Sequence, residues 1–456
     1  MPTAATPLAH AFGARYDLPL PLLLFVLGGG VVVAASFLLL ARRAVPAAPA
    51  AVGADRSALL PLRPVPTTLS LLALGLLILT GLLGSQEVAE NLLPTVFWLL
   101  VWIAVPLSCG LLGDWTQRLN PFAHAARLCG GARLRRSLLG SDRPVGWPRW
   151  VGWWPAVGLL FLLACGELIV NRTATLPRVT AVGLLVYLGL CAFCGLLFGP
   201  TWVQRGEVFS VLLSTWGRLG YFRFGASGRR GLGGGLDDPF EASPSRVTFV
   251  LLLLVSVNVD GLLATPLWSR LQLRLPASVG PGTAALEALT TAAFVGLAAV
   301  VALVFTGFAR ASVRLAGSPG HRGALTGLLP SLLPIAFGYL LAHNLQYLLV
   351  NAQLLVPLLG NPTGLPGGSL HLPAPFNDSF EVHRGVLPSA AYWYVSLVVV
   401  VVVHVAAVHL AHRHFGRATA DHRLARRSEY PWLVAMVGYT MLSLWLLAQP
   451  LVLENA

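Results

Sequence analysis

Charged residues are scarce in this sequence. Asp, Glu, Lys and Arg make up 11% of the 456 residues, whereas soluble globular proteins average about 25%. Hydrophobic residues make up 56%, so the composition excludes an ordinary soluble domain and predicts an integral membrane protein. The apolar runs are continuous over about 20 residues instead of alternating over about 10, which predicts spanning helices and excludes an outer-membrane β-barrel.

Lysine is absent, and all 31 basic residues are arginine. The formal net charge is +13, but the arginines lie in short segments between apolar runs. A membrane surface explains this distribution better than a nucleic acid does. We therefore expect the lipid bilayer as a partner and no nucleic acid.

The sequence also lacks the common catalytic motifs of soluble enzymes. The sequence contains no Walker loop, HExxH, GxSxG or dinucleotide-binding fingerprint, so ATP-driven transport by this chain alone is not expected. There are five cysteines. Cys191 and Cys194 have CxxC spacing inside an apolar run without a second pair, and we interpret them as packing residues.

The fold class predicted is all-α, a polytopic transmembrane bundle of about ten spans with both termini outside. Residues 1–20 have no basic n-region and no apolar h-region, and we interpret them as a short translocated tail. Placing the N-terminus outside leaves 25 of the 31 arginines in cytoplasmic loops, a strong positive-inside pattern. The expected spans are 21–41, 68–86, 92–113, 151–170, 179–200, 247–266, 284–308, 324–350, 390–412 and 431–452.

The chain divides into two membrane halves of five spans each, 1–224 and 246–456, joined by a Gly-rich cytoplasmic linker at 225–245. A weak repeat occurs in the first half. Cys109-Gly-Leu-Leu precedes Trp115-Thr-Gln-Arg118, and Cys194-Gly-Leu-Leu precedes Trp202-Val-Gln-Arg205. The repeat indicates either a duplicated two-helix unit or two similar interfacial anchors, with Trp at the interface and Arg at the phosphates.

The stretch 334–353 is the most unusual span. It is apolar enough to cross a bilayer, yet one half of its helical circumference carries polar side chains and the other half carries leucines. We expect the leucine face to contact lipid and the polar face to line a helix bundle or a wet cavity. The polar face comprises Tyr339, His343, Asn344, Gln346, Tyr347, Asn351 and Gln353.

Several polar residues lie in the outer third of the predicted spans. His343, Asp260 and Glu167 are the candidate catalytic residues, because ionisable groups at such depth are costly and usually functional. One His with carboxylates is the ligand set of a divalent metal, which His343 and Asp260 would hold, or a proton relay. The structural alternative places Glu167 and Asp260 at the water boundary and His343 in a hydrogen bond within the bundle. The candidate substrate-binding residues are Asn344, Gln346, Tyr347 and Asn258.

A second group of histidines lies on the ninth expected span and just beyond its end. His404 lies in mid-membrane, and His409 is five residues further on, so the two side chains diverge by about 140° on a helix. His412 and His414 fall near Arg413 and Arg417, and we interpret them as solvated or in contact with lipid headgroups.

The N-terminal tail from Ala9 to Pro21 and the turn from Trp115 to Phe122 resemble those of a bacterial membrane-protein family identified as fenitrothion hydrolase. The resemblance covers mainly the N-terminal half. It implies an inner-membrane enzyme that hydrolyses organophosphate triesters, and it assigns no catalytic residue. In that family the His-Ala-Phe-Gly stretch follows a signal-like segment, which implies a processed N-terminal histidine able to bind copper; only nine residues precede His10 here.

Three functions remain open at this stage. The first is a bacterial inner-membrane hydrolase in which a metal at His343 and Asp260 activates water against a phosphotriester. The second is a secondary transporter or permease that uses the same outward cavity for protons or a small-molecule substrate. The third is a non-catalytic subunit of a membrane complex.

Overall fold

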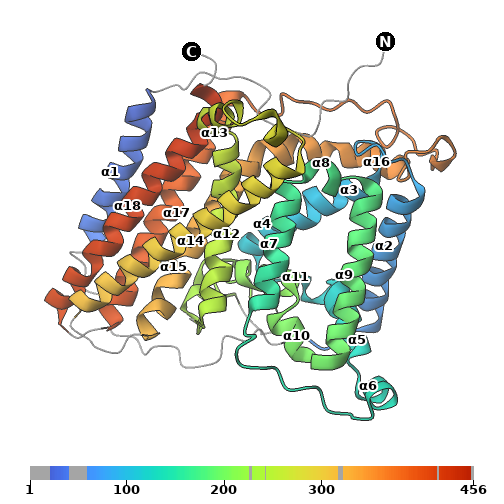
Figure 1. Cartoon of the computed structure of the whole chain (residues 1–456), viewed down its shortest axis with the longest axis horizontal. Coiled ribbons are helices and arrows are strands. Elements are labelled where there is room, and N and C mark those ends of the chain that lie inside the picture. The colour runs from blue at the N-terminus through green and yellow to red at the C-terminus, as the bar shows by residue number, and fades with distance from the viewer. Residues whose placement is uncertain are drawn as a thin grey trace. The chain divides into compact units, whose positions relative to one another are not determined.

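A computed structural model describes residues 21–40, 59–224, 229–241, 243–316, 322–418 and 421–452. Within these residues the chain is helical, and its single β-bridge joins Phe222 and Arg229 outside any strand. His10 and most of the N-terminal tail lie outside the described residues. The all-α, multi-pass prediction is confirmed (Figure 1).

The helices belong to two compact units. The first unit takes its described residues from 1–55, 236–346 and 387–456. The second takes them from 56–235 and 347–386. One boundary therefore falls within the segment 225–245, and another falls near the end of the helix that contains His343.

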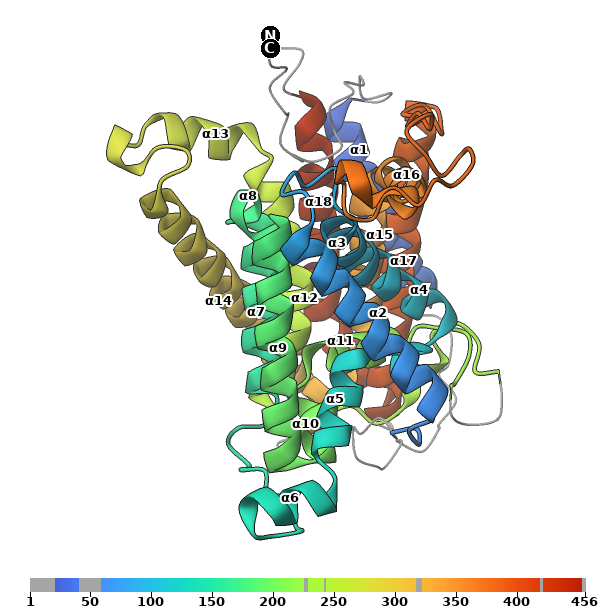
Figure 2. The same cartoon turned by 90° about the vertical axis from the view of Figure 1, so that its right-hand side faces the viewer.

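The first unit is built mainly from long helices. Its elements are α1 (Leu22–Leu40), α12 (Pro244–Leu263), α13 (Pro266–Leu273), η4 (Ala277–Val279), α14 (Ala284–Leu315), α15 (Arg322–Asn351, whose last five residues belong to the second unit), α17 (Ser389–Ala418) and α18 (His422–Val452). Helix α18 packs against α1, α14, α17 and α12, and α1 runs beside it in both ribbon views (Figure 1 and Figure 2). It therefore holds this unit together.

The second unit contains more short helices and turns. Its elements are α2 (Pro64–Leu83), α3 (Leu92–Pro94), the π-helix η1 (Thr95–Ala104), α4 (Val105–Leu112), η2 (Thr116–Arg118), α5 (Pro121–Cys129), α6 (Ala132–Leu139), α7 (Trp154–Leu168), α8 (Asn171–Ala174), α9 (Pro177–Phe198), α10 (Pro200–Arg205), α11 (Val208–Trp216), η5 (Ala352–Leu354), α16 (Leu355–Gly360) and η6 (Pro366–Gly368); η3 (Gly234–Asp237) spans the unit boundary. Proline begins several of these helices, where its missing N–H costs nothing.

Nine apolar helices in the described part of the chain are long enough to cross a bilayer. Each overlaps an expected span. The remaining expected span, 151–170, corresponds to α7, whose 15 residues rise only about 22 Å at 1.5 Å per residue. The chain is a multi-pass helical membrane protein.

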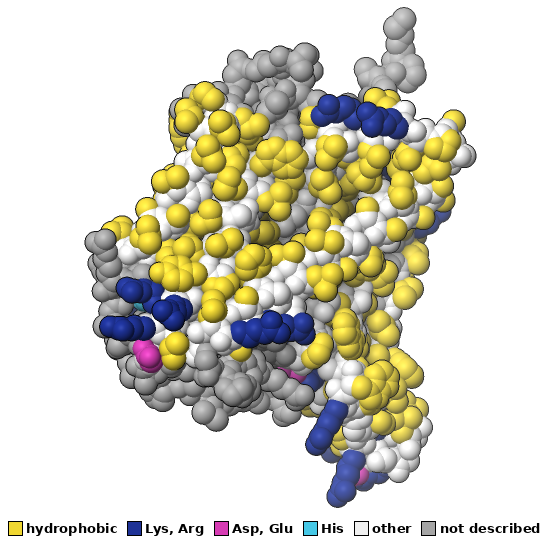
Figure 3. Space-filling view, turned by 60° about the vertical axis from the view of Figure 1, so that its left-hand side comes forward, with side chains coloured by type: hydrophobic (Ala, Val, Ile, Leu, Met, Phe, Trp, Pro, Cys, Tyr) yellow, Lys and Arg dark blue, Asp and Glu magenta, His cyan; other side chains and the backbone are white. Residues whose placement is uncertain are grey.

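Burial separates inner helices from outer ones. In the most apolar stretch of α12, 67% of the residues are buried. The corresponding figure is 72% for the span from Leu328 to Gly360, which includes most of α15, and 17–44% for the other spans. Helix α14 is the most exposed, and it presents Val295, Leu303 and Val304 outward. Hydrophobic side chains cover much of the face in Figure 3, as lipid contact requires.

Burial does not distinguish the expected lipid-facing leucine stripe on residues 334–353 from the polar face. No side chain between Leu328 and Leu358 is exposed, and Leu341, Leu345 and Leu348 are half-buried. Helix α15 is buried from Leu328 to Tyr339, and most of its later residues are half-buried. Polar side chains on such a helix must find partners within the protein.

Candidate functional site

The centre of the candidate site is a histidine–carboxylate contact between two inner helices. His343 lies on α15 and Asp260 lies near the end of α12, and His343 Nε2 contacts Asp260 Oδ2. The two side chains are 10% and 12% exposed. An ion pair taken out of water is expensive unless its geometry and surroundings compensate for the lost hydration. A pair at this depth therefore needs a functional or structural reason.

Tyr339 lies one helical turn before His343 on α15. The two rings are stacked, with centroids 6.4 Å apart and an interplanar angle of 8°. Among the described residues, the buried Tyr339 hydroxyl has no hydrogen-bond partner. Gly261 faces this hydroxyl, since a Cβ there would lie 3.3 Å from the oxygen. A polar oxygen is thus held beside the pair without a bond of its own.

Asn258 extends the polar groups from α12 to α18. Its Nδ2 donates a hydrogen bond to the Tyr439 hydroxyl at 2.5 Å. Its buried Oδ1 has no partner within the described chain. A carboxamide with one end anchored and the other end unsatisfied is suited to contact a bound water or solute.

His404, on α17, contacts the same tyrosine as Asn258 does. Its ring packs against Tyr439, with centroids 6.2 Å apart. Its Nδ1 lies 2.7 Å from the Val400 carbonyl oxygen, and because a carbonyl only accepts, Nδ1 carries the proton. The neutral ring then presents Nε2 as an acceptor, and no described residue donates to it. We call Asp260, His343, Tyr339, Asn258, Tyr439 and His404 the polar cluster of the first unit.

The other predicted site residues have different environments. Asn344 donates from Nδ2 to the Leu340 carbonyl of its own helix at 3.0 Å, so its amide is used locally. Gln346 and Tyr347 are half-buried on α15, and the boundary between the units passes between them. Glu167 belongs to the second unit, where its Oε2 accepts a hydrogen bond from Trp102 Nε1 at 2.7 Å. The contacts within the cluster therefore include Asn258 and omit these four residues.

The donor set bears on the metal hypothesis. Within the described residues, no group of three or more His, Cys, Asp or Glu side chains is arranged to hold a metal ion. His343 and Asp260 supply two ligands, whereas a catalytic zinc usually has three protein ligands and one open position. Cys191 and Cys194 are buried free thiols.

A second buried His–carboxylate pair lies elsewhere in the first unit. His412 Nδ1 on α17 lies 3.0 Å from Glu429 Oε1 on α18, and both side chains are buried. The expectation that His412 is solvated or in contact with lipid headgroups is therefore wrong. Helical spacing gave no indication of Glu429, because the partner comes from a neighbouring helix whose orientation depends on tertiary packing.

Comparison with known proteins adds no relative. No family model matches the chain, and neither the curated proteins nor the solved structures gave a match. The functional argument therefore depends on the geometry of the polar cluster alone.

Proposed function

We propose that this integral membrane protein is a proton-coupled secondary transporter, and that the His343–Asp260 pair binds the coupling proton. The observation that carries the proposal is the burial of this pair between α12 and α15, the two inner helices. Ionisable side chains inside spans commonly mark ion pathways and proton relays. A histidine–carboxylate pair exchanges protons within the physiological range more readily than other side-chain pairs.

The surroundings of the pair support transport. Tyr339 Oη, Asn258 Oδ1 and His404 Nε2 are buried polar atoms that lack hydrogen-bond partners among the described residues. Unsatisfied atoms of this kind are rare in native proteins and usually serve a bound water, an ion or a ligand. In the proposed cluster they would contact a solute or the water that carries protons.

The pair also supplies a switch. With His343 protonated, a further proton on Asp260 would remove the negative charge that attracts the imidazolium, so the contact between α12 and α15 would weaken. Release of the proton restores it. Proton binding would in this way shift the balance between two arrangements of the inner helices, and alternating access needs such a shift.

The hydrolase hypothesis assigns the same residues to a different reaction. It rests on the resemblance of the N-terminal tail and of the turn from Trp115 to Phe122 to the fenitrothion hydrolase family, and it would use His343 and Asp260 as metal ligands. Hydrolysis by a metal-bound water would need further ligands from water or substrate, because the described residues contain no third side chain suited to the role.

One pair of assays separates the two functions. The purified protein is reconstituted into liposomes that enclose a pH-sensitive dye, and amino acids, short peptides, sugars, nucleosides and quaternary amines are added one at a time. We expect at least one solute to drive a proton flux that is absent from empty liposomes. Chelator-sensitive release of nitrophenol from a chromogenic phosphotriester, without solute-driven flux, would overturn the proposal in favour of the hydrolase.

A further inference from the structure

The repeated motif of the second unit is longer than its Cys-Gly-Leu-Leu core. Leu99-Leu100-Val101-Trp102 precedes Cys109 by the same number of residues that separates Leu184-Leu185-Val186-Tyr187 from Cys194. After the core, Asn120 and Glu207 occupy equivalent positions. Asn120 caps α5 by accepting from the N–H groups of the next turn, and Glu207 caps α11 in the same way. Each copy is therefore a long helix, a turn and a capped short helix.

In each copy, the short helix packs on the long helix of the other copy. Helix α5 of the first copy packs on α9 of the second, and α11 of the second packs on α4 of the first. At their meeting point, Asn120 Nδ2 donates to Glu207 Oε2 at 2.8 Å. The rings of Phe122 and Phe209 stack with centroids 5.4 Å apart. Equivalent residues thus contact one another, as in a two-fold symmetric interface.

The two repeated tryptophans have different environments. Trp202 is 4% exposed, and Trp115 donates from Nε1 to Ser108 Oγ at 3.0 Å. Trp202 therefore lies inside the protein, whereas Trp115 is half-buried. The glutamines of the two turns have another role in common.

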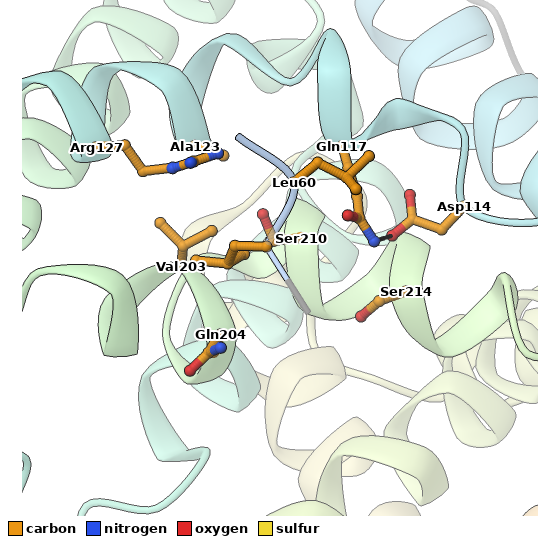
Figure 4. A pocket seen from close by; sticks show the side chains of 10 residues that line it. Leu60, Asp114, Gln117, Ala123, Arg127, Val203, Gln204, Ser210 and Ser214 are labelled. Atoms are coloured by element: carbon orange, nitrogen blue, oxygen red, sulfur yellow. Dashed lines mark hydrogen bonds between the residues drawn. The ribbon is translucent and has the colours of Figure 1, made fainter. Parts of the chain in front are cut away.

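Gln117 and Gln204 line one pocket, and each comes from one copy of the repeat. Figure 4 shows the pocket with the side chains around it, and those that carry polar groups are Asp114, Gln117, Arg127, Gln204, Ser210 and Ser214. In this view Arg127 enters from one side and Asp114 from the other, with Ser210 between them. Sites at the junction of internal repeats are where many transporters bind their ligands.

The two charged side chains of the pocket are not paired with each other. Asp114 accepts hydrogen bonds from Thr116 Oγ1 at 2.7 Å and from Gln117 Nε2 at 3.1 Å. Arg127 forms no ion pair with any acidic side chain in the described part of the chain. Burial raises the pKa of Asp114 and lowers the pKa of Arg127. Desolvation disfavours the charged form of each group in the free protein.

We propose that this pocket binds a small zwitterion, with its ammonium group on Asp114 and its carboxylate on Arg127. Arginine is suited to hold a carboxylate through two parallel hydrogen bonds. The hydroxyls of Ser210 and Ser214 line the space between the charges. This site is separate from the polar cluster, and it does not depend on the transport proposal.

The test uses three probes that divide the ligand into its parts. L-alanine carries both charges, acetate carries only the carboxylate, and methylammonium carries only the ammonium. Binding to the full-length protein in detergent is measured by isothermal titration and by the rise in thermal stability. We expect alanine to bind at least tenfold more tightly than either half-ligand.

Variants locate the site. Arg127→Gln and Asp114→Asn should each weaken alanine binding at least tenfold, and Arg127→Lys, which keeps the charge and changes least, should weaken it by a smaller factor. Arg136→Gln is the control, since Arg136 is exposed and pairs with Asp142. Acetate binding as tightly as alanine, absence of alanine binding, or unchanged binding in both charge-removing variants would each overturn the proposal.

Discussion

Polar groups serve different purposes in the two units. In the first unit they project from within long helices and do not cap them, so the backbone there is already hydrogen-bonded and needs no help from side chains. In the second unit they lie at helix ends. Glu207, which is completely buried, accepts from the N–H groups of Phe209 and Ser210, from Asn120 and from Tyr187. A buried polar group that satisfies no backbone group is therefore the better candidate for function.

The largest expected effect is a loss of proton flux when the His343–Asp260 pair is broken. Asp260→Asn and His343→Gln should reduce solute-driven proton flux to the level of empty liposomes, because each removes a group that binds or stabilises the coupling proton. Asp378→Asn is the control, since Asp378 is an exposed carboxylate on a loop. Full flux in both pair variants would place the coupling elsewhere.

The next largest expected effect is a loss of stability when the buried carboxylate of the second unit is removed. Glu207→Ala should lower the free energy of unfolding by about 3 kcal/mol, because several buried donors lose a charged acceptor at once. Thermal unfolding in detergent measures this loss, and exposed Glu381→Ala serves as the matched carboxylate control. A stability equal to that of the control would show that the cap network is not needed for folding.

The second histidine–carboxylate pair of the first unit is formed by His412 and Glu429. Glu429→Gln should lower the free energy of unfolding by about 2 kcal/mol, since it replaces the carboxylate that faces His412 with a neutral amide and weakens a buried hydrogen bond. Proton flux per folded molecule should remain, because His412 and Glu429 are not members of the polar cluster. If Glu429→Gln stops the flux as completely as Asp260→Asn does, burial of a pair does not distinguish function from structure here.

The smallest effect is a pH dependence in the second unit. Burial and the nearby Arg127 lower the pKa of His124 from its usual 6.5, so the folded protein favours the neutral ring. As pH falls below 6.5, the unfolded chain takes up the proton first, and the free energy of unfolding decreases until the folded state is protonated too. Thermal unfolding across this range should show a decrease of about 2 °C in Tm. This decrease should disappear in His124→Gln.

The sequence predicted the spans well because bilayer thickness sets their length independently of packing. The expected span 21–41 is observed as Leu22–Leu40. The pattern of polar residues within the spans also led to His343 and Asp260, since ionisable side chains are conspicuous in apolar helices. The structure brings these two together.

Asn258 was also a candidate from the sequence, but the other three members of the cluster were not assigned to the site. Tyr339 lies four residues before His343 and shares its helical face, so periodicity pointed to it without assigning it a role. Tyr439 and His404 depend on how α17 and α18 are rotated against α12, which the pattern of one sequence does not specify. The pocket of the second unit was missed because the glutamines of its repeated turns were taken as parts of a surface motif.

Proton coupling by the His343–Asp260 pair is tested most directly by comparing two transport modes of Asp260→Asn, with a solute that drives flux in the wild-type protein. Exchange of labelled for unlabelled solute requires no net proton movement, whereas accumulation against a gradient does. We predict that Asp260→Asn retains exchange and loses proton-driven accumulation. Accumulation at the wild-type level in this variant would contradict the assignment of the coupling proton to this pair.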